Sequence, residues 1–225
     1  MKAIWGFKMK LKPLAFAATL VFALNWLSGT PASAQSGSCD AVKITAFGDS
    51  LTAGYGLNPG EGFPEQLQAK LNADGLPVEI INAGVSGDTT TGGLARLDWS
   101  LSQKTDAVIL ELGANDALRG ISPALTRKNL DAMIVALKGK GLEVVLAGML
   151  APPNMGPAYG EEFNRIYSEL SEKHGIILYP FFLDGVAADA SLNQAGGIHP
   201  TKEGIAVIVD KFAPTAKKLI SKLCN

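Results

Sequence analysis

The sequence is poor in the residues that form metal sites and disulfide frameworks. Its 225 residues include two cysteines and two histidines, and His174 and His199 lie far apart in the chain. Two cysteines exclude a disulfide-dense scaffold, and two separated histidines leave no ligand cluster for a structural zinc ion. We therefore expect a protein without a bound metal or another cofactor.

Basic charge is scarce as well. The chain has 20 lysines and arginines against 21 aspartates and glutamates, and four of the lysines lie within the first 12 residues. Without those four the balance is 16 to 21, a net charge of −5. An acidic chain without a basic stripe argues against nucleic acid or an anionic membrane as the main partner.

The first residues have the composition of an export signal. Four lysines precede an apolar run over residues 14–27, which is followed by the small residues Ala32-Ser33-Ala34. This pattern predicts a secretory signal peptide, residues 1–34, that is cleaved after Ala34. An uncleaved anchor is the alternative, but the run is shorter than the roughly 20 residues that span a bilayer. We expect a periplasmic or secreted protein with no stable membrane anchor, in which residues 35–225 form a single domain.

Export would place both cysteines where disulfides persist. Cys39 precedes the first expected strand and Cys224 ends the last expected helix. Because a helix that covers a parallel sheet runs antiparallel to its strands, both cysteines should lie at one edge of the sheet. We expect an intramolecular bridge; two free thiols and an intermolecular bond are the alternatives.

Five short runs rich in valine, isoleucine and leucine alternate with longer helical patterns. Alternation of this kind predicts a parallel sheet with helices on both faces, a three-layer α/β/α fold. The third run is apolar without alternation, as expected of a central strand, but Glu111 within it has no explanation. The expected strands cover residues 43–47, 78–81, 107–112, 144–147 and 176–179.

Two helices can be outlined from their boundaries and their apolar faces. Ser122-Pro123 is typical of a helix start, and Gly141 marks its end. The last helix carries apolar residues at helical spacing over residues 205–223. Pro214 lies inside it and is expected to kink the helix or to split it in two.

The residues that follow the expected strands carry the chemistry. In an open α/β sheet, ligands bind beyond the carboxyl ends of the strands. The segments there supply a hydroxyl, a glycine N–H, an amide side chain and an imidazole, which are the parts that acyl transfer requires. The four segments are Gly48-Asp49-Ser50-Leu51, Asn82-Ala83-Gly84, Gly113-Ala114-Asn115-Asp116 and Gly196-Gly197-Ile198-His199-Pro200.

Each of these residues also has a plainer interpretation. Ser50 could be only a helix N-cap, and Gly84 could be a turn residue. Asn115 could form an Asx turn, and His199 could be a surface imidazole ahead of a helix. His174 is explained as a charge near a helix C-terminus, so His199 is the only candidate for a general base.

At these segments the sequence resembles the GDSL or SGNH hydrolase family, in which Ser, Gly, Asn and His occupy four separated blocks. Residues 82–99, 111–120 and 151–156 are similar to its branch of secreted esterases called thioesterase I, lysophospholipase L1 or arylesterase. The resemblance covers residues 43–223 and implies the fold of that family, a flavodoxin-like five-stranded parallel sheet between two helical layers.

The resemblance also implies a function and a role for each residue. The protein would be a secreted serine esterase that acts on aryl esters, acyl thioesters or lysophospholipids, with Ser50 as nucleophile and His199 as general base. The backbone N–H groups of Ser50 and Gly84 and the side-chain amide of Asn115 would stabilise the oxyanion. Asp49 has no obvious chemical task and is interpreted as a turn or cap residue.

The sequence departs from the family pattern at Gly196. The fourth block of the family reads Asp-x-x-His, in which the aspartate orients the imidazole, whereas this chain has Gly196 three residues before His199. Asp184, Asp189 or a backbone carbonyl could orient the imidazole instead. Loss of such a carboxylate can cost on the order of 10⁴ in turnover.

This departure keeps rival hypotheses open. A non-catalytic or weakly active binding protein on a decayed hydrolase scaffold is one, and a carbohydrate O-deacetylase is another. Glycine spacing around residues 54–60 does not match a dinucleotide fingerprint, and no Walker sequence or Gly-x-Ser-x-Gly elbow occurs. For an esterase we expect a monomer with a small-molecule ester or thioester substrate, and residues 151–160 as the loop that lines the acyl pocket.

Overall fold

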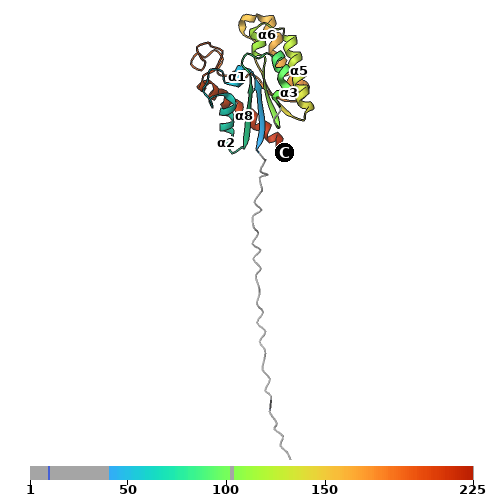
Figure 1. Cartoon of the computed structure of the whole chain (residues 1–225), viewed down its shortest axis with the longest axis vertical. Helices are drawn as coiled ribbons and strands as arrows, with labels where there is room; N and C mark the ends of the chain where they lie inside the picture. Colours follow the sequence, from blue (N-terminus) through green and yellow to red (C-terminus); the bar gives the residue numbers. More distant parts are fainter. Residues whose placement is uncertain (1–9, 11–40, 102–103, 225) are drawn as a thin grey trace, which may run out of the picture. The chain divides into compact units, whose positions relative to one another are not determined.

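A parallel β-sheet lies at the centre of the protein, with helices on both of its faces (Figure 1). The computed structural model describes residues 10, 41–101 and 104–224. The chain divides into the units Met1–Ser36 and Gly37–Asn225, and the fold is that of the second unit. The predicted signal peptide and Cys39 lie outside the described residues, so residues 1–34 as a leader and 35–225 as one domain stay predictions.

The five strands run parallel in the order β2-β1-β3-β4-β5, which confirms the predicted flavodoxin-like sheet. Gly48 at the end of β1 is in register with Gly84 of β2 and Glu111 of β3. The loops that follow these three strands therefore start side by side. The strands are β1 (Val42–Gly48), β2 (Val78–Gly84), β3 (Ala107–Glu111), β4 (Glu143–Ala147) and β5 (Ile177–Tyr179).

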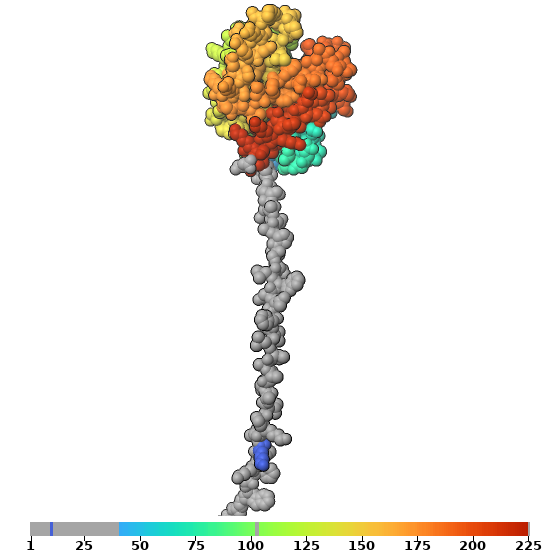
Figure 2. Space-filling view, turned by 180° about the vertical axis from the view of Figure 1, so that it is seen from behind, coloured from blue at the N-terminus to red at the C-terminus, as the bar shows by residue number. Residues whose placement is uncertain are grey.

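The helices form two layers. In Figure 1, α2 and α8 cover one face of the sheet and α3 and α5 the other. Figure 2 shows α8, in red, at the surface beside the orange segment that precedes it. The helices are α1 (Ser50–Ala53), α2 (Phe63–Ala73), α3 (Thr90–Ser100), α4 (Ala114–Leu118), α5 (Pro123–Gly139), the 3-10 turn η1 (Pro153–Met155), α6 (Pro157–Asn164), α7 (Ile166–His174) and α8 (Lys202–Leu223).

Helix α8 is continuous, so the alternative that Pro214 splits it in two is wrong. Proline removes one backbone hydrogen bond, but the apolar face on both sides of Pro214 is buried, from Ile205 to Ile220. Burial of each large apolar side chain contributes about 1.5 to 3 kcal/mol, which outweighs the lost bond. Thr201 caps the start of the helix by accepting the Gly204 N–H at 3.2 Å.

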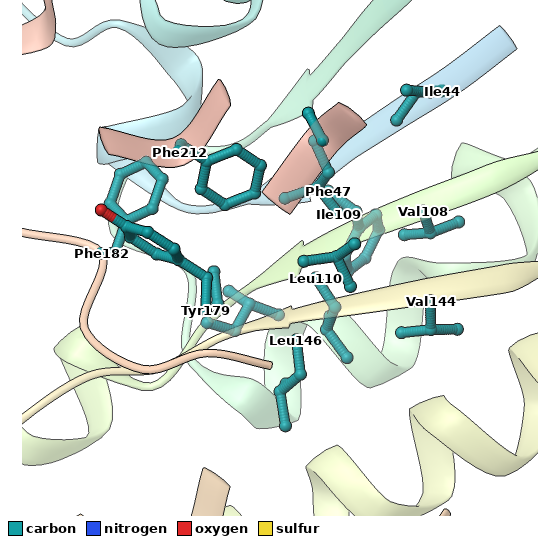
Figure 3. Packing of buried hydrophobic residues seen from close by; sticks show 14 of the residues in the cluster. Ile44, Phe47, Val108, Ile109, Leu110, Val144, Leu146, Tyr179, Phe182 and Phe212 are labelled. Carbon is teal, nitrogen blue, oxygen red and sulfur yellow. The ribbon is translucent and has the colours of Figure 1, made fainter. Parts of the chain in front are cut away.

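An aromatic cluster joins α8 to the segment that leaves β5 (Figure 3). The rings of Phe182 and Phe212 meet that of Phe63 edge to face, with centroids 4.9 and 5.2 Å apart. All three side chains are fully buried. Such pairs add about 0.5 to 1.5 kcal/mol to the hydrophobic gain. The cluster anchors the start of the long connection between β5 and α8.

Candidate active site

Ser50 and His199 meet at the carboxyl edge of the sheet. Ser50 is the first residue of α1, directly after β1, and His199 lies just before α8. The His199 Nε2 and Ser50 Oγ atoms are 2.9 Å apart, although the residues are 149 positions apart in the chain. The structure therefore brings together the predicted nucleophile and the predicted base, at hydrogen-bond distance.

Asp49, which precedes Ser50 in the chain, forms a hydrogen bond with Asn115, another predicted site residue. The Asp49 carboxylate is buried and caps α1 by accepting the Leu51 N–H at 3.0 Å, as a cap residue should. Its second oxygen accepts a hydrogen bond from Asn115 Nδ2, also at 3.0 Å. A side-chain amide has two N–H groups, so one stays available for a ligand. The sequence interpretation missed this second task of Asp49.

Glu111, unexplained by the sequence, lies directly beneath this turn. Its Oε2 atom accepts hydrogen bonds from the Thr52 hydroxyl at 2.8 Å and from the Asp49 N–H at 3.3 Å. Its other oxygen is buried without a hydrogen-bond partner among the described residues. Burial, followed by the nearby Asp49 charge, raises the pKa of Glu111 well above its usual value. The fold therefore favours the neutral form of Glu111.

Burial also raises the pKa of Asp49, to about 6. The hydrogen bonds from Leu51 and Asn115 oppose that rise because they stabilise the charged form. Above pH 6, Asp49 is mostly ionised and acts as an acceptor for both donors. The turn that carries Ser50 thus rests on two buried carboxyl groups, those of Asp49 and Glu111.

The structure does not place Gly84 where the sequence interpretation expected it. The Gly84 N–H donates to Asn82 Oδ1 at 3.0 Å, and a side chain at Gly84 would collide with the backbone of Ala53. Gly84 thus allows the close approach of β2 and α1, and it does not line the cavity described below. Gly87, three residues later, does line that cavity, and its carbonyl accepts a hydrogen bond from Arg119 at 2.7 Å.

Arg96, on α3, connects the ends of β1 and β2 with the loop that follows β2. Its guanidinium donates to the carbonyls of Gly48 at 2.8 Å and Ala83 at 2.9 Å, and it pairs with Asp88. The group lies 3.9 Å from the centre of the Phe47 ring, and the side chain is buried. A buried arginine with these four contacts holds the nucleophile loop and the loop that carries Gly87 at a set distance.

No carboxylate orients His199 within the described part of the chain. Asp184 pairs with Lys211 at 2.9 Å, and Asp189 accepts the backbone N–H of Ser191 at 2.8 Å. Neither aspartate therefore takes the place of the missing family residue. The His199 ring has its hydrogen bond to Ser50, and partial burial lowers the pKa of the ring below its usual value.

A cavity of about 780 Å³ opens beside the Ser50–His199 pair. In Figure 2 the surface is hollowed between the yellow region of α6 and the orange segment that precedes α8. Of the predicted loop 151–160, the first three residues line the cavity. The walls are mostly apolar, and they include Leu118, Met149, Leu150, Phe181, Leu183 and Ile198. This shape and lining fit a small ligand with an apolar tail.

Three further expectations concern metal binding, a membrane anchor and the disulfide. Residues 41–101 and 104–224 contain no group of three or more His, Cys, Asp or Glu side chains able to hold a metal ion. No helix in these ranges has the length and hydropathy to cross a bilayer. Cys224 is disulfide-bonded. Its predicted partner, Cys39, lies outside the described residues, so the pairing itself stays a prediction.

The chain matches known proteins over most of its length. Residues 46–207 match the model of the GDSL-like lipase/acylhydrolase family. The chain is 42% identical to an arylesterase of Vibrio mimicus, covering 72% of this chain and 81% of that protein. It is 39% identical to esterase TesA of Pseudomonas aeruginosa, covering 80% and 90%. The crystal structure of AlinE4, an SGNH-hydrolase family esterase, is 44% identical, covers 80% of this chain and 97% of its own, and has a TM-score of 0.68.

Proposed function

Because the chain belongs to the GDSL-like lipase/acylhydrolase family, we propose that it is a serine esterase that cleaves carboxylic esters through an acyl-enzyme on Ser50. One observation carries this proposal. The Ser50 hydroxyl and the His199 imidazole form a hydrogen bond of 2.9 Å on the wall of an apolar cavity. A serine hydroxyl becomes a useful nucleophile only when a base of this kind accepts its proton.

The geometry supports a two-step reaction. In the first step, Ser50 Oγ forms a bond to the ester carbonyl carbon while its proton moves to His199 Nε2, and the carbonyl π electrons move onto oxygen. The tetrahedral intermediate collapses when the bond to the leaving group breaks, and the leaving group takes the proton from Nε2. In the second step, water attacks the acyl-enzyme in the same way, and the acid and Ser50 are released.

Three donors would stabilise the negative charge that develops on the carbonyl oxygen. They are the backbone N–H groups of Ser50 and Gly87 and the second N–H of the Asn115 amide. Gly87 replaces Gly84 here because Gly87 lines the cavity and the Gly84 N–H is already bonded to Asn82. Donors that are held before the reaction stabilise the developing charge without further reorganisation. Asp49 fixes the Asn115 amide, and Arg119 fixes the Gly87 peptide.

The cavity favours esters of apolar acids. An acyl chain gains hydrophobic energy against the walls, whereas a sugar would leave its hydroxyl groups without partners there. This lining supports aryl esters, acyl thioesters and lysophospholipids over a carbohydrate ester, and the names of the relatives fit the first group. We further propose that the protein is exported to the periplasm or beyond and acts there as a monomer, after cleavage near Ala34.

The test compares the protein with Ser50→Ala on a chromogenic short-chain aryl ester and with a serine-directed fluorophosphonate. The unchanged protein should turn over the ester and should be labelled at Ser50, and Ser50→Ala should lose both properties while it stays folded. Ser168→Ala removes an exposed hydroxyl on α7 and should behave like the unchanged protein. Equal turnover by the Ser50 variant would contradict the assignment. A folded protein that is neither active nor labelled would favour the non-catalytic binding protein.

A further inference from the structure

The His199 imidazole has no carboxylate partner among the described residues, but it has an aromatic neighbour. The ring of Tyr55 lies against that of His199, with centroids 4.7 Å apart and planes tilted by 36°. This separation falls in the range in which aromatic rings attract one another. Tyr55 lines the cavity and is 56% exposed, so its ring borders both the catalytic pair and the space where a ligand would bind.

The position of Tyr55 is fixed from both sides of its backbone. Its N–H donates to the carbonyl of Ser50 at 3.1 Å, so the residue is anchored to the nucleophile itself. Its carbonyl accepts a hydrogen bond from Gln194 Nε2 at 2.8 Å. The ring is thus carried on a backbone that has little freedom relative to Ser50.

Gln194 also fixes the segment that carries His199. Its backbone N–H donates to the His199 carbonyl at 2.8 Å, and its Nε2 atom donates to the Pro200 carbonyl at 2.9 Å. The side-chain amide of Gln194 has two N–H groups, so it can donate both to the Tyr55 carbonyl and to the Pro200 carbonyl. The contacts form a closed circuit that runs from Ser50 through Tyr55, Gln194 and His199 back to Ser50.

We propose that Tyr55 is a positioning residue of His199 and that its ring, supported by Gln194, does part of the orienting work of the absent carboxylate. The inference rests on the proposed function. The tilted ring of Tyr55 restricts rotation of the imidazole and keeps Nε2 directed at the Ser50 hydroxyl. The negative face of the ring also attracts the imidazolium that forms when His199 takes the serine proton. Both effects act on the transition state more than on the bound substrate.

The first test separates the ring from the hydroxyl of Tyr55. Tyr55→Ala should lower kcat roughly 10- to 100-fold, the scale that misplacement of a catalytic group can cost, with KM within about threefold. Tyr55→Phe keeps the ring and should restore kcat. Trp99→Ala removes another exposed aromatic ring, on α3, and serves as the matched control. A rise in KM alone would make Tyr55 a substrate contact, and equal losses in the Ala and Phe variants would assign the effect to the hydroxyl. Either result overturns the proposal.

The second test measures coupling to the missing carboxylate. In a Gly196→Asp background a carboxylate would share the orienting work, so Tyr55→Ala should cost at least several-fold less than in the unchanged protein. The same fold loss in both backgrounds would show that Tyr55 does not act through His199. If Tyr55→Ala is unfolded, Tyr55→Leu keeps the bulk without the aromatic face and should give the same losses.

The failure of this inference can be told from a failure of the proposed function. An unchanged protein that hydrolyses aryl esters and is labelled at Ser50 upholds the function, whatever the Tyr55 variants do. The rate of fluorophosphonate labelling gives a further readout, because it reports activation of Ser50 without an acyl chain in the cavity. Tyr55→Ala should slow labelling by the same factor as kcat, and an unchanged rate would overturn the role of Tyr55.

Discussion

At the scale of single residues, Gly196 distinguishes this site from its family pattern. A side chain at Gly196 would extend into open space, and the backbone there does not adopt a positive φ angle. An aspartate would therefore fit without strain. The absence of the carboxylate is thus a matter of one side chain, and the backbone of the segment is still suited to carry it.

We predict that Gly196→Asp raises turnover. A carboxylate three residues before His199 would hold the imidazole in the productive tautomer and stabilise the imidazolium. kcat should increase by one or more orders of magnitude, up to the roughly 10⁴ that such a group can contribute. Steady-state kinetics on an aryl ester measures the change, and thermal unfolding confirms that the variant is folded.

The same substitution should change the pH profile in a defined direction. His199 works as a base only when neutral, and partial burial lowers its pKa, so activity should persist below pH 6.5 in the unchanged protein. A neighbouring carboxylate favours the imidazolium and raises the pKa, so the acid limb should move to higher pH in Gly196→Asp. A folded variant with unchanged turnover and an unchanged acid limb would show that the site does not lack this group.

At the scale of elements, the site depends on short segments that follow strands in register. Helix α1 is four residues long and α4 five, which is too short for stability by propensity alone. Glu111, at the end of β3, bonds to Thr52 of α1 and to the N–H of Asp49. The Glu111 carboxyl group therefore holds the nucleophile turn onto the sheet.

We predict that Glu111→Gln preserves the fold and changes how stability depends on pH. Because folding raises the pKa of Glu111, the folded protein keeps a proton that the unfolded chain loses above about pH 4.5. The free energy of unfolding then falls as pH rises, by up to about 1.4 kcal/mol per unit for this group. The variant has no such proton and should be more stable relative to the unchanged protein at pH 8 than at pH 5.

Urea unfolding at several pH values checks this prediction. Asp49, with a pKa of about 6, should still contribute a falling slope between about pH 4 and 6 in both proteins. Glu172→Gln changes an exposed carboxylate on α7 and should leave the pH dependence as it is. Parallel curves for Glu111→Gln and the unchanged protein would mean that Glu111 is ionised in the fold.

At the scale of the whole molecule, the start of β1 and the end of α8 lie at the same edge of the sheet (Figure 1). Strand β1 begins at Val42, and α8 runs back along the sheet and ends at Leu223. The disulfide-bonded Cys224 is the next residue. A covalent link at this edge would close nearly the whole domain into one loop.

We predict a Cys39–Cys224 disulfide in protein from an oxidising compartment. A loop of this length stabilises the folded state by roughly 4 to 5 kcal/mol in the chain-entropy model. Mass spectrometry after alkylation should find no free thiol, and reduction should lower the urea midpoint. Cys39→Ser and Cys224→Ser should each match the reduced protein. Two alkylated cysteines in the untreated protein would refute the bridge.

Local patterns in the sequence were enough to predict the strands, two helix boundaries and three residues of the candidate site. Runs rich in valine, isoleucine and leucine predicted all five strands to within a few residues, because such side chains are typical of parallel strands that helices cover on both faces. Helix α5 begins at Pro123 and α7 ends at His174, as proline and glycine signals indicated. Ser50, Asn115 and His199 could be singled out because residues after parallel strands meet at one edge.

Only the tertiary structure decided how these residues are supported. No local pattern relates Glu111 to Thr52, or Gln194 to Tyr55, because the partners lie 59 and 139 positions apart. The choice between Gly84 and Gly87 likewise depends on which glycine faces the cavity and which packs against α1. Spacing along the chain identifies residue types that can do chemistry, whereas orientation and burial arise from contacts that form when distant segments pack together.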